Sequence, residues 1–267
     1  MYQSHWGLRD DPFRAGHDPR FFYQSPTHEE ALARLYFLID QQRRLGLLLG
    51  DQGSGKSFLL EMLAKEIRRG GACVVQTSLV GCDPAEWLGQ VAAQLGRHPG
   101  NTQSIAVLWR WIGDRLAEHR YEERTTLVLL DDAHLASAAL LPHVLRLAHY
   151  DPSPQSRLTI AMSSTAEGAH RLGRDLLELV ELRIDLEPWE PDETEQYLQQ
   201  SLAQAGGESP IFDSSAILRL HELTRGVPRR VSQLADLALV AGAGRNLQQI
   251  DAQVIDSVYR ELGAICV

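Results

Sequence analysis

The stretch GDQGSGKS, residues 50–57, follows the apolar run LGLLLG at 45–50 and precedes a helical pattern at 58–69. Its spacing matches G-x-x-x-x-G-K-[ST], the loop that binds nucleotide phosphates between a strand and a helix. Glycines let successive backbone N–H groups turn toward the phosphates, and the start of the helix adds a partial positive charge. The alternative is a glycine turn that only joins a strand to a helix. Because strand, loop and helix stand in the required order, the sequence favours a phosphate-binding loop.

The residues of this loop predict ATP and Mg²⁺ as ligands. Only two residues of the chain are lysines, Lys56 and Lys65, and the first occupies the lysine position of the motif. We expect Lys56 to reach the β- and γ-phosphates and Ser57 to ligate Mg²⁺. The expected nucleotide contacts are Gly50, Asp51, Gln52, Gly53, Ser54, Gly55, Lys56, Ser57 and Phe58.

Two adjacent carboxylates end the buried strand pattern in LVLLDDAH, residues 127–134. A strand beside the phosphate-binding loop would deliver these acids to the nucleotide, where Asp131 would hold Mg²⁺ through its water shell. Asp132 stands where hydrolytic members of this class usually carry a glutamate that orients the attacking water. Because aspartate is one methylene shorter, we expect slow hydrolysis. The alternative is that both acids are simply solvated at a strand end.

Two further segments bring polar or charged side chains to the ends of elements. RLTIAMSST ends a strand with Ser163, Ser164 and Thr165, one of which could hydrogen-bond the γ-phosphate or the water. The alternative is that they cap a helix that begins near residue 166. TRGVPRR, 224–230, places Arg229 and Arg230 in the first turn of a helix, where the helix dipole disfavours cations. A nearby anion would explain this position, and two solvated arginines are the alternative.

Apolar runs alternate with helical periodicity up to residue 186, and only helical patterns follow. The expected strands are 45–50, 72–79, 125–132, 157–164 and 181–186, and the expected helices before residue 187 are 27–43, 58–69, 84–96, 104–119, 137–149 and 166–179. This order indicates an α/β fold with a parallel sheet covered by helices on both faces. Helices near 192–205, 213–224, 228–241 and 251–262, with Asp192 and Asp213 as N-caps, predict a small all-helical part. We therefore expect an irregular N-terminal arm at 1–26, a core at 27–188 and a helical lid domain at 189–267.

Composition excludes several other classes of protein. The 26 Lys and Arg residues against 35 Asp and Glu give a net charge of −9, the wrong sign for a broad nucleic-acid-coating surface. The three cysteines lack disulfide or metal spacing, and His134, His143 and His149 fit no zinc pattern. No window approaches the roughly 18 apolar residues of a spanning helix, and the N-terminus does not resemble a signal peptide. We expect a soluble, cytoplasmic protein without a membrane segment.

Together these motifs resemble the AAA+ ATPases, and more narrowly the ExeA-type (general secretion pathway protein A) family, a relative of the transposition ATPases. The resemblance is carried by residues 2–35, GDQGSGKS, LVLLDDAH, RLTIAMSST, LEPWEPDETEQYLQQSLAQAG (186–206) and GVPRRVSQLADLALVAG (226–242). It implies a P-loop NTPase (AAA+) core followed by a small helical lid. Full-length ExeA proteins continue into a transmembrane segment and a periplasmic part, so the resemblance covers their ATPase module.

The resemblance also implies roles for individual residues. Arg229 corresponds to the sensor-2 arginine, which reaches from the lid to the phosphates. Thr165 best matches the sensor-1 position, with Ser164 second. The adenine would lie near the N-terminal arm and the helix after it, with Phe22, Tyr23 and His28 as candidate contacts and plain core packing as the alternative.

AAA+ enzymes generally act as rings in which an arginine finger of one subunit completes the site of its neighbour. The resemblance therefore implies a homo-oligomer. Arg171, Arg174 and Arg183 are the candidate fingers. The family tends to carry an arginine four residues before the one aligned with Arg183, and this chain has Leu179 there.

The expected function is a Mg²⁺-dependent ATPase that couples ATP binding and hydrolysis to lid movement, self-assembly and action on an unknown protein partner. One alternative is a slow or non-hydrolysing ATP-bound scaffold, which the short Asp132 favours. A second is a DNA-binding regulator like the transposition ATPases, which the net charge of −9 disfavours. A DEAH-type helicase, which DDAH at residues 131–134 resembles, is disfavoured, because one such core with a helical lid lacks a second motor domain.

Overall fold

A computed structural model describes residues 2–13, 23–97, 104–153, 155–207 and 209–263. The chain divides into two compact units. The α/β unit consists of residues 28–52 and 56–186, and the helical unit consists of residues 1–27, 53–55 and 187–267. No helix within the described residues is both long and apolar enough to cross a membrane.

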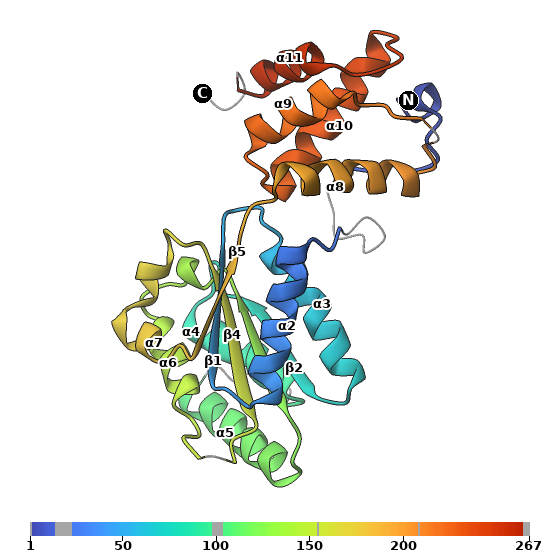
Figure 1. Cartoon of the computed structure of the whole chain (residues 1–267). Coiled ribbons are helices and arrows are strands. Elements are labelled where there is room, and N and C mark those ends of the chain that lie inside the picture. Colours follow the sequence, from blue (N-terminus) through green and yellow to red (C-terminus); the bar gives the residue numbers. More distant parts are fainter. Residues whose placement is uncertain (1, 14–22, 98–103, 154, 208, 264–267) are drawn as a thin grey trace. The chain divides into compact units, whose positions relative to one another are not determined.

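The α/β unit is built on a parallel sheet of five strands in the order β2-β3-β4-β1-β5 (Figure 1). The strands are β1 Leu45–Gly50, β2 Cys73–Ser78, β3 Thr126–Asp131, β4 Leu158–Ser164 and β5 Leu182–Leu186. The helices are α2 Pro26–Asp40, α3 Lys56–Arg69, α4 Pro84–Gln94, α5 Ile105–Tyr121, α6 Leu141–Ala148 and α7 Arg174–Glu178. The predicted α/β fold class is confirmed.

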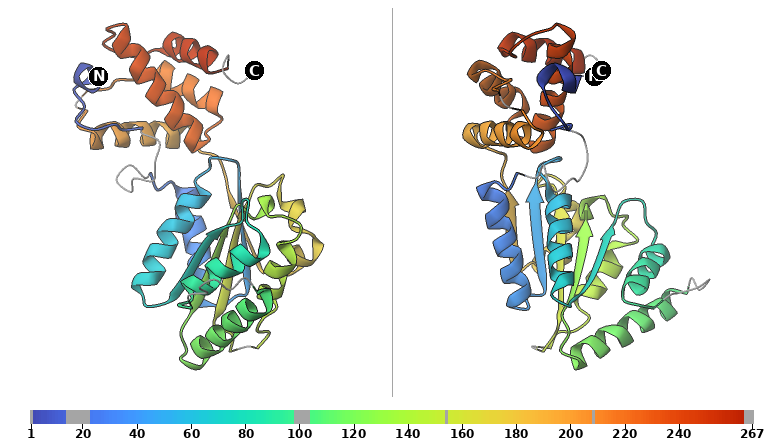
Figure 2. Two further views of the ribbon diagram at one scale, coloured as in Figure 1. Left: turned by 180° about the vertical axis from the view of Figure 1, so that it is seen from behind. Right: turned by 90° about the vertical axis from the view of Figure 1, so that its right-hand side faces the viewer.

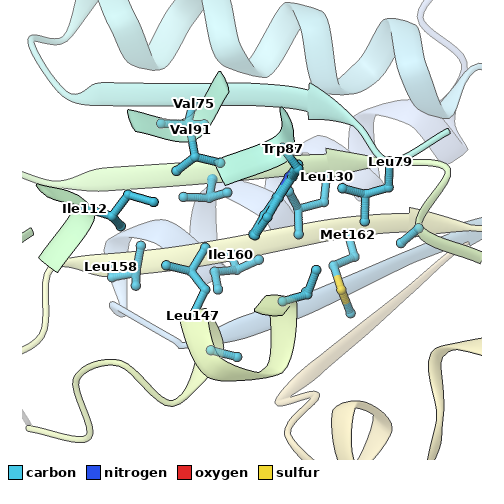
Figure 3. Close-up of a cluster of buried hydrophobic side chains, with 14 of the residues drawn as sticks. Val75, Leu79, Trp87, Val91, Ile112, Leu130, Leu147, Leu158, Ile160 and Met162 are labelled. Atoms are coloured by element: carbon cyan, nitrogen blue, oxygen red, sulfur yellow. The ribbon is translucent and has the colours of Figure 1, made fainter. Parts of the chain in front are cut away.

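Both faces of this sheet are buried, because successive side chains of each strand point to opposite faces. In β1, Leu48 packs in one apolar cluster with α2 and α3. Its neighbours Leu47 and Leu49 pack in the other cluster, with α4, α5 and α6. Figure 2 shows helices on both sides of the sheet, and Figure 3 shows Trp87 of α4 beside Leu130 and Met162. The continuous apolar runs of the strands are explained by this double burial.

Two predicted helices of the α/β unit are wrong in their bounds. The pattern over 166–179 is interrupted by Gly173, whose φ is +81°, so a 3₁₀ turn at Ala169–Leu172 precedes the short α7. The pattern over 137–149 begins as a helix only at Leu141, with Pro142 in its first turn. Another 3₁₀ turn, Ala133–Leu135, follows β3. Proline is favoured in a first helical turn, and a glycine with positive φ ends a helix, which accounts for both boundaries.

The helical unit contains α1 Tyr2–Trp6, α8 Pro191–Gln204, α9 Ser214–Thr224, α10 Pro228–Gly244 and α11 Ala252–Gly263. Asp213 caps α9 as expected, since its side chain accepts the Ala216 amide at 2.7 Å. The expectation that Asp192 caps α8 is wrong. Glu190 is the N-cap and forms a reciprocal capping box with Glu193, while Pro191 fills the first helical position. Proline there fixes the helix start one residue earlier than the pattern indicates.

The N-terminal segment is part of the helical unit, although we expected an irregular arm of its own. Its first residues form the helix α1, in which Trp6 Nε1 donates to the Leu239 carbonyl of α10 at 2.9 Å. Phe13 and Tyr23 are buried in the core of the same unit. Among the described residues, Trp6, Phe13 and Tyr23 of this segment therefore pack within the helical unit.

Gly226 is held where no side chain fits, and we expect Gly226→Ala to destabilise the protein strongly. Its φ is +66°, and an added Cβ would lie 2.0 Å from the carbonyl oxygen of Trp189. The Trp189 amide also donates to the Gly226 carbonyl at 2.9 Å, so the two segments cannot easily separate. We expect a loss of at least about 2 kcal/mol of unfolding free energy, measured by chemical denaturation.

The matched control is Gly244→Ala at the end of α10, where an added Cβ would meet nothing within 4 Å. Its unfolding free energy should change by less than about 1 kcal/mol, because alanine suits a helix. Equal stabilities of the two variants would contradict the close approach at Gly226.

Candidate nucleotide-binding site

The phosphate-binding loop joins β1 to α3, with Gly50 ending the strand and Lys56 beginning the helix. Lys56 is only 6% exposed, and its Nζ donates to the carbonyls of Gly50 and Asp51, both at 2.8 Å. A buried ammonium must have such partners, because an unpaired charge in the interior is costly. These two bonds fix the cation at the carboxyl end of β1.

The residues of this loop fit a nucleotide phosphate and a hard cation. Gly53 and Gly55 have φ values of +92° and +99°, a backbone that residues with side chains rarely adopt. The loop opens onto the N-terminus of α3, a helix of 14 residues whose first amides have no partner in the helix itself. The Ser57 hydroxyl and the Asp131 carboxylate are oxygen ligands of the type that Mg²⁺ prefers.

Asp131 ends β3, Asp132 follows it, and the two share one hydroxyl partner, Ser163 at the end of β4. The Ser163 Oγ donates to Asp131 Oδ1, and it accepts the Asp132 amide at 2.9 Å. The Asp132 amide also lies 3.1 Å from Asp131 Oδ1. Asp132 itself adopts left-handed backbone angles, with φ 50° and ψ 44°. The two carboxylates therefore lie on a sharply turned segment that is tied to the neighbouring strand.

The two hydroxyls predicted to act near the nucleotide, Ser164 and Thr165, bond within their own turn. Ser164 Oγ donates to the Thr165 carbonyl at 2.9 Å. Thr165 Oγ1 accepts the amide of Gly168 at 2.9 Å, which is the capping role that the sequence left open. Ser163, one of three hydroxyls that the sequence offered, is the one that bonds the Asp131 carboxylate and the Asp132 amide. The register of β4 against β3 decides this, and a single sequence does not reveal that register.

His134 lies directly after the two carboxylates, and the structure gives it surroundings that sequence reasoning did not identify. Its ring packs so close to Gly168 that a Cβ there would lie 2.6 Å from Cδ2. Burial lowers the pKa of His134, the Asp132 carboxylate opposes this shift, and Lys56 and Arg171 add to it. His134 is therefore neutral at neutral pH and links the turn after β3 to the turn after β4.

Arg229 lies in the first turn of α10, as the sequence predicted. Within the helical unit, to which residues 53–55 belong, the Arg229 amide donates to the Gly53 carbonyl at 3.1 Å. A Cβ on Gly53 would lie 2.8 Å from the Arg229 Cβ, so glycine permits this approach. The backbone of Arg229 thus contacts the phosphate-binding loop.

The three candidate adenine contacts have different surroundings. Phe22 lies outside the described residues. Tyr23 is buried in the helical unit, where its hydroxyl donates to Gln196 Oε1 at 2.8 Å and its ring meets Trp189 edge-on. His28 is 2% exposed in the first turn of α2. Packing accounts for Tyr23, and contact of any of the three with adenine stays a prediction.

The candidate arginine fingers differ in their ion pairs. Arg174 pairs with Glu178 at 2.6 Å, and Arg183 pairs with Asp185 at 2.8 Å. Arg171 is exposed in the 3₁₀ turn before α7 and makes no ion pair with any residue that the structure describes. Of the three, Arg171 has the side chain that is least engaged within its own chain.

Comparison with known proteins defines the class to which this site belongs. A sequence-family profile described as "AAA domain" matches residues 39–172, and the chain belongs to this family. More narrowly, the predicted similarity to general secretion pathway protein A is confirmed. The protein of that name from Aeromonas hydrophila is 27% identical over 258 residues, which is 94% of this chain and 46% of that protein. The chain thus spans about half the length of this curated relative.

Solved structures with the same fold are AAA+ proteins. Cdc6p from Pyrobaculum aerophilum has a TM-score of 0.73 at 17% identity and covers 95% of this chain and 71% of its own. Aeropyrum pernix ORC1, solved in complex with DNA, has a TM-score of 0.66 at 17% identity, and the match covers 97% of this chain and 69% of ORC1. The Thermotoga maritima RuvB Holliday junction branch migration motor has a TM-score of 0.59 at 16% identity, and the match covers 88% of this chain and 69% of RuvB. At these identities the likeness concerns the fold alone.

Proposed function

We propose that this chain is a Mg²⁺-dependent ATPase whose nucleotide state controls its helical unit and its self-assembly. The observation that carries the proposal is the pairing of Lys56 with the carbonyls of Gly50 and Asp51. This pairing sets a cation at the end of β1, and Asp131 ends β3 at the same edge of the parallel sheet. A cation for phosphate and a carboxylate for a metal at one sheet edge are the two parts that nucleotide hydrolysis needs.

Each predicted site residue of the α/β unit has a defined task in this proposal. Lys56 exchanges its carbonyl partners for the β- and γ-phosphate oxygens, and the loop amides bind the same phosphates. Ser57 and Asp131 would hold Mg²⁺, which, when bound, supplies positive charge to the phosphate oxygens. Asp132 orients a water for in-line attack and accepts its proton. Thr165, or Ser164, bonds the γ-phosphate after leaving its present partner.

Arg229 couples this chemistry to the helical unit. Its backbone contact with Gly53 supports a position from which the guanidinium reaches a phosphate bound in the loop. ATP would then bind most tightly when Arg229 and Lys56 contact it together, which shifts the population toward that arrangement. Loss of the γ-phosphate removes this preference.

We expect the protein to form a larger assembly with ATP than with ADP, because the active site would be completed by an arginine of a neighbouring copy. The exposed Arg171 is the candidate that we favour, since Arg174 and Arg183 are already in ion pairs. Light scattering in the two nucleotides measures the effect. A monomer in both, at tens of micromolar protein and with measured ATP occupancy, would count heavily against assembly.

Two other functions each have one observation in their favour. A non-hydrolysing scaffold is supported by the short carboxylate of Asp132 and its constrained left-handed backbone. A DNA-binding regulator is supported by the fold it shares with Aeropyrum pernix ORC1, solved in complex with DNA. The net charge of −9 weighs against this second alternative.

One experiment separates these functions. ATP turnover is measured with and without Mg²⁺ and with and without duplex DNA, and the mass of the protein is measured in ADP and in a non-hydrolysable ATP analogue. Mg²⁺-dependent turnover supports the ATPase. Binding without turnover favours the scaffold, and stimulation by DNA favours the regulator.

A further inference from the structure

The buried hydroxyl of Ser163 forms a bridge between the consecutive residues Asp131 and Asp132. The side chain is 0% exposed, and a buried hydroxyl must satisfy its own hydrogen bonds. It does so with two groups at once, donating to Asp131 Oδ1 and accepting the Asp132 amide at 2.9 Å. The hydroxyl thereby uses its one donor on Asp131 and one of its acceptor lone pairs on Asp132, the next residue.

The sheet order explains how β4 supplies this bridge from Ser163 to Asp131 and Asp132. β4 lies between β3, which ends at Asp131, and β1, which leads to the phosphate-binding loop. Leu130 of β3 pairs with Met162 of β4, so the next residue along β4, Ser163, follows alongside Asp131. On its other side Ser163 pairs with Leu48 of β1. Ser163 therefore stands between the two strands that carry the expected phosphate and metal ligands.

The bridge leaves the two oxygens of Asp131 in different states. Oδ1 accepts from both the Ser163 hydroxyl and the Asp132 amide. Oδ2 receives no hydrogen bond from the residues that the structure describes. The carboxylate is thus held by one oxygen while the other remains able to accept from the water shell of a cation.

The bridge also acts on the backbone of Asp132. Its φ of 50° lies in the left-handed region, which is disfavoured for residues other than glycine and persists only when its surroundings hold it. The hydrogen bond that the Asp132 amide donates to the Ser163 hydroxyl is one such restraint. The backbone angles in turn set where the Asp132 carboxylate leaves the chain.

We propose that Ser163 is a positioning residue that orients Asp131 toward Mg²⁺ and holds Asp132 in its left-handed turn. This inference rests on the proposed ATPase function. It assigns Ser163 no contact with the nucleotide, and it separates Ser163 from Ser164 and Thr165, whose hydroxyls bond within their own turn.

The test compares Ser163→Ala with Ser78→Ala. Ser78 is the matched control because it pairs with Asp131 from the opposite side, on β2. Among the described residues, the Ser78 Oγ accepts the Val80 amide at 3.3 Å and bonds neither carboxylate residue. Calorimetry measures ATP-analogue affinity with and without Mg²⁺, hydrogen exchange measures protection of the Asp132 amide in the ligand-free protein, and turnover is recorded in parallel.

For Ser163→Ala we expect unchanged affinity without Mg²⁺ and loss of most of the tightening that Mg²⁺ gives the parent. Exchange of the Asp132 amide should be faster, and turnover should fall about tenfold, because the carboxylates lose their fixed position. Ser78→Ala should match the parent in all three measurements. Retention of the Mg²⁺ effect and of Asp132 protection in Ser163→Ala would overturn the proposal.

Failure of the ATPase proposal has a different signature. A parent protein that binds ATP with Mg²⁺ but never hydrolyses it would contradict the proposed function. The Mg²⁺ effect on affinity and the Asp132 exchange rate would still test Ser163, because neither measurement requires hydrolysis.

Discussion

Lys56→Ala is expected to abolish detectable ATP binding and to lower turnover on the order of 10³-fold, the largest effect of any substitution considered. In the proposed function, the lysine ammonium is the positive charge that the loop offers to the β- and γ-phosphates, and charge-assisted bonds of this kind are stronger than neutral ones. Its two carbonyl partners at 2.8 Å show that the cation is already held at the loop. Titration calorimetry with ATP and a steady-state turnover assay measure the two effects.

The control for this prediction is Lys65→Ala. Lys65 lies on the same helix, α3, and is exposed, so its removal tests the loss of one positive charge without touching the loop. ATP affinity and turnover of this variant should equal those of the parent. Were Lys56→Ala also to bind and hydrolyse ATP like the parent, the phosphate-binding assignment of residues 50–57 would be wrong.

Asp132→Asn is expected to lower turnover on the order of 10²-fold and to leave ATP affinity nearly unchanged. The amide cannot accept the proton of the attacking water, whereas Asp131, Ser57 and Lys56 would still be in place to bind metal and phosphate. Asparagine tolerates the left-handed angles of φ 50° and ψ 44° as well as aspartate does, so the backbone should not move. If this variant hydrolyses ATP as fast as the parent, Asp132 has no catalytic role and the scaffold function moves ahead.

Asp132→Glu tests the reach of the same carboxylate. One more methylene extends the oxygens by about 1.5 Å, toward the position that a glutamate would occupy in related hydrolases. Because the longer side chain brings the carboxylate oxygens closer to the attacking water, we expect faster ATP turnover than in the parent. Glutamate is less suited than aspartate to a left-handed backbone, so the structure also predicts a lower melting temperature. A rate at or below that of the parent, with the fold intact, would show that reach is not what limits hydrolysis.

The sequence was sufficient for the sheet because its signal is local. Each strand is an apolar run, and the run is apolar on both faces, since Leu47 and Leu48 pack in different clusters. The phosphate-binding loop was equally clear, because its glycines and Lys56 are adjacent in sequence. Patterns of this kind can be read from the sequence because they depend only on residues that are neighbours along the chain.

The parts that sequence reasoning missed depend on contacts between distant segments. Ser163 and Ser164 end β4 and Thr165 follows them, and only the pairing with β3 selects Ser163 as the partner of Asp131. The aromatic residues of the N-terminal segment gave no indication that Trp6 would bond to Leu239 in α10. The left-handed turn at Asp132 is likewise held by a residue that lies 31 positions away.

The burial of Lys56 makes the chain convenient for chemical labelling. Lys56 and Lys65 are the only two lysine side chains in the sequence, and Lys56 is 6% exposed with its amine bonded to two carbonyls. Of the two lysines, an amine-reactive dye should therefore modify Lys65, which is exposed, and spare Lys56. Lys65 lies nine positions after Lys56, which corresponds to about 13.5 Å along α3. A fluorophore on Lys65 would thus report on events at the loop from a fixed site that leaves the nucleotide contacts untouched.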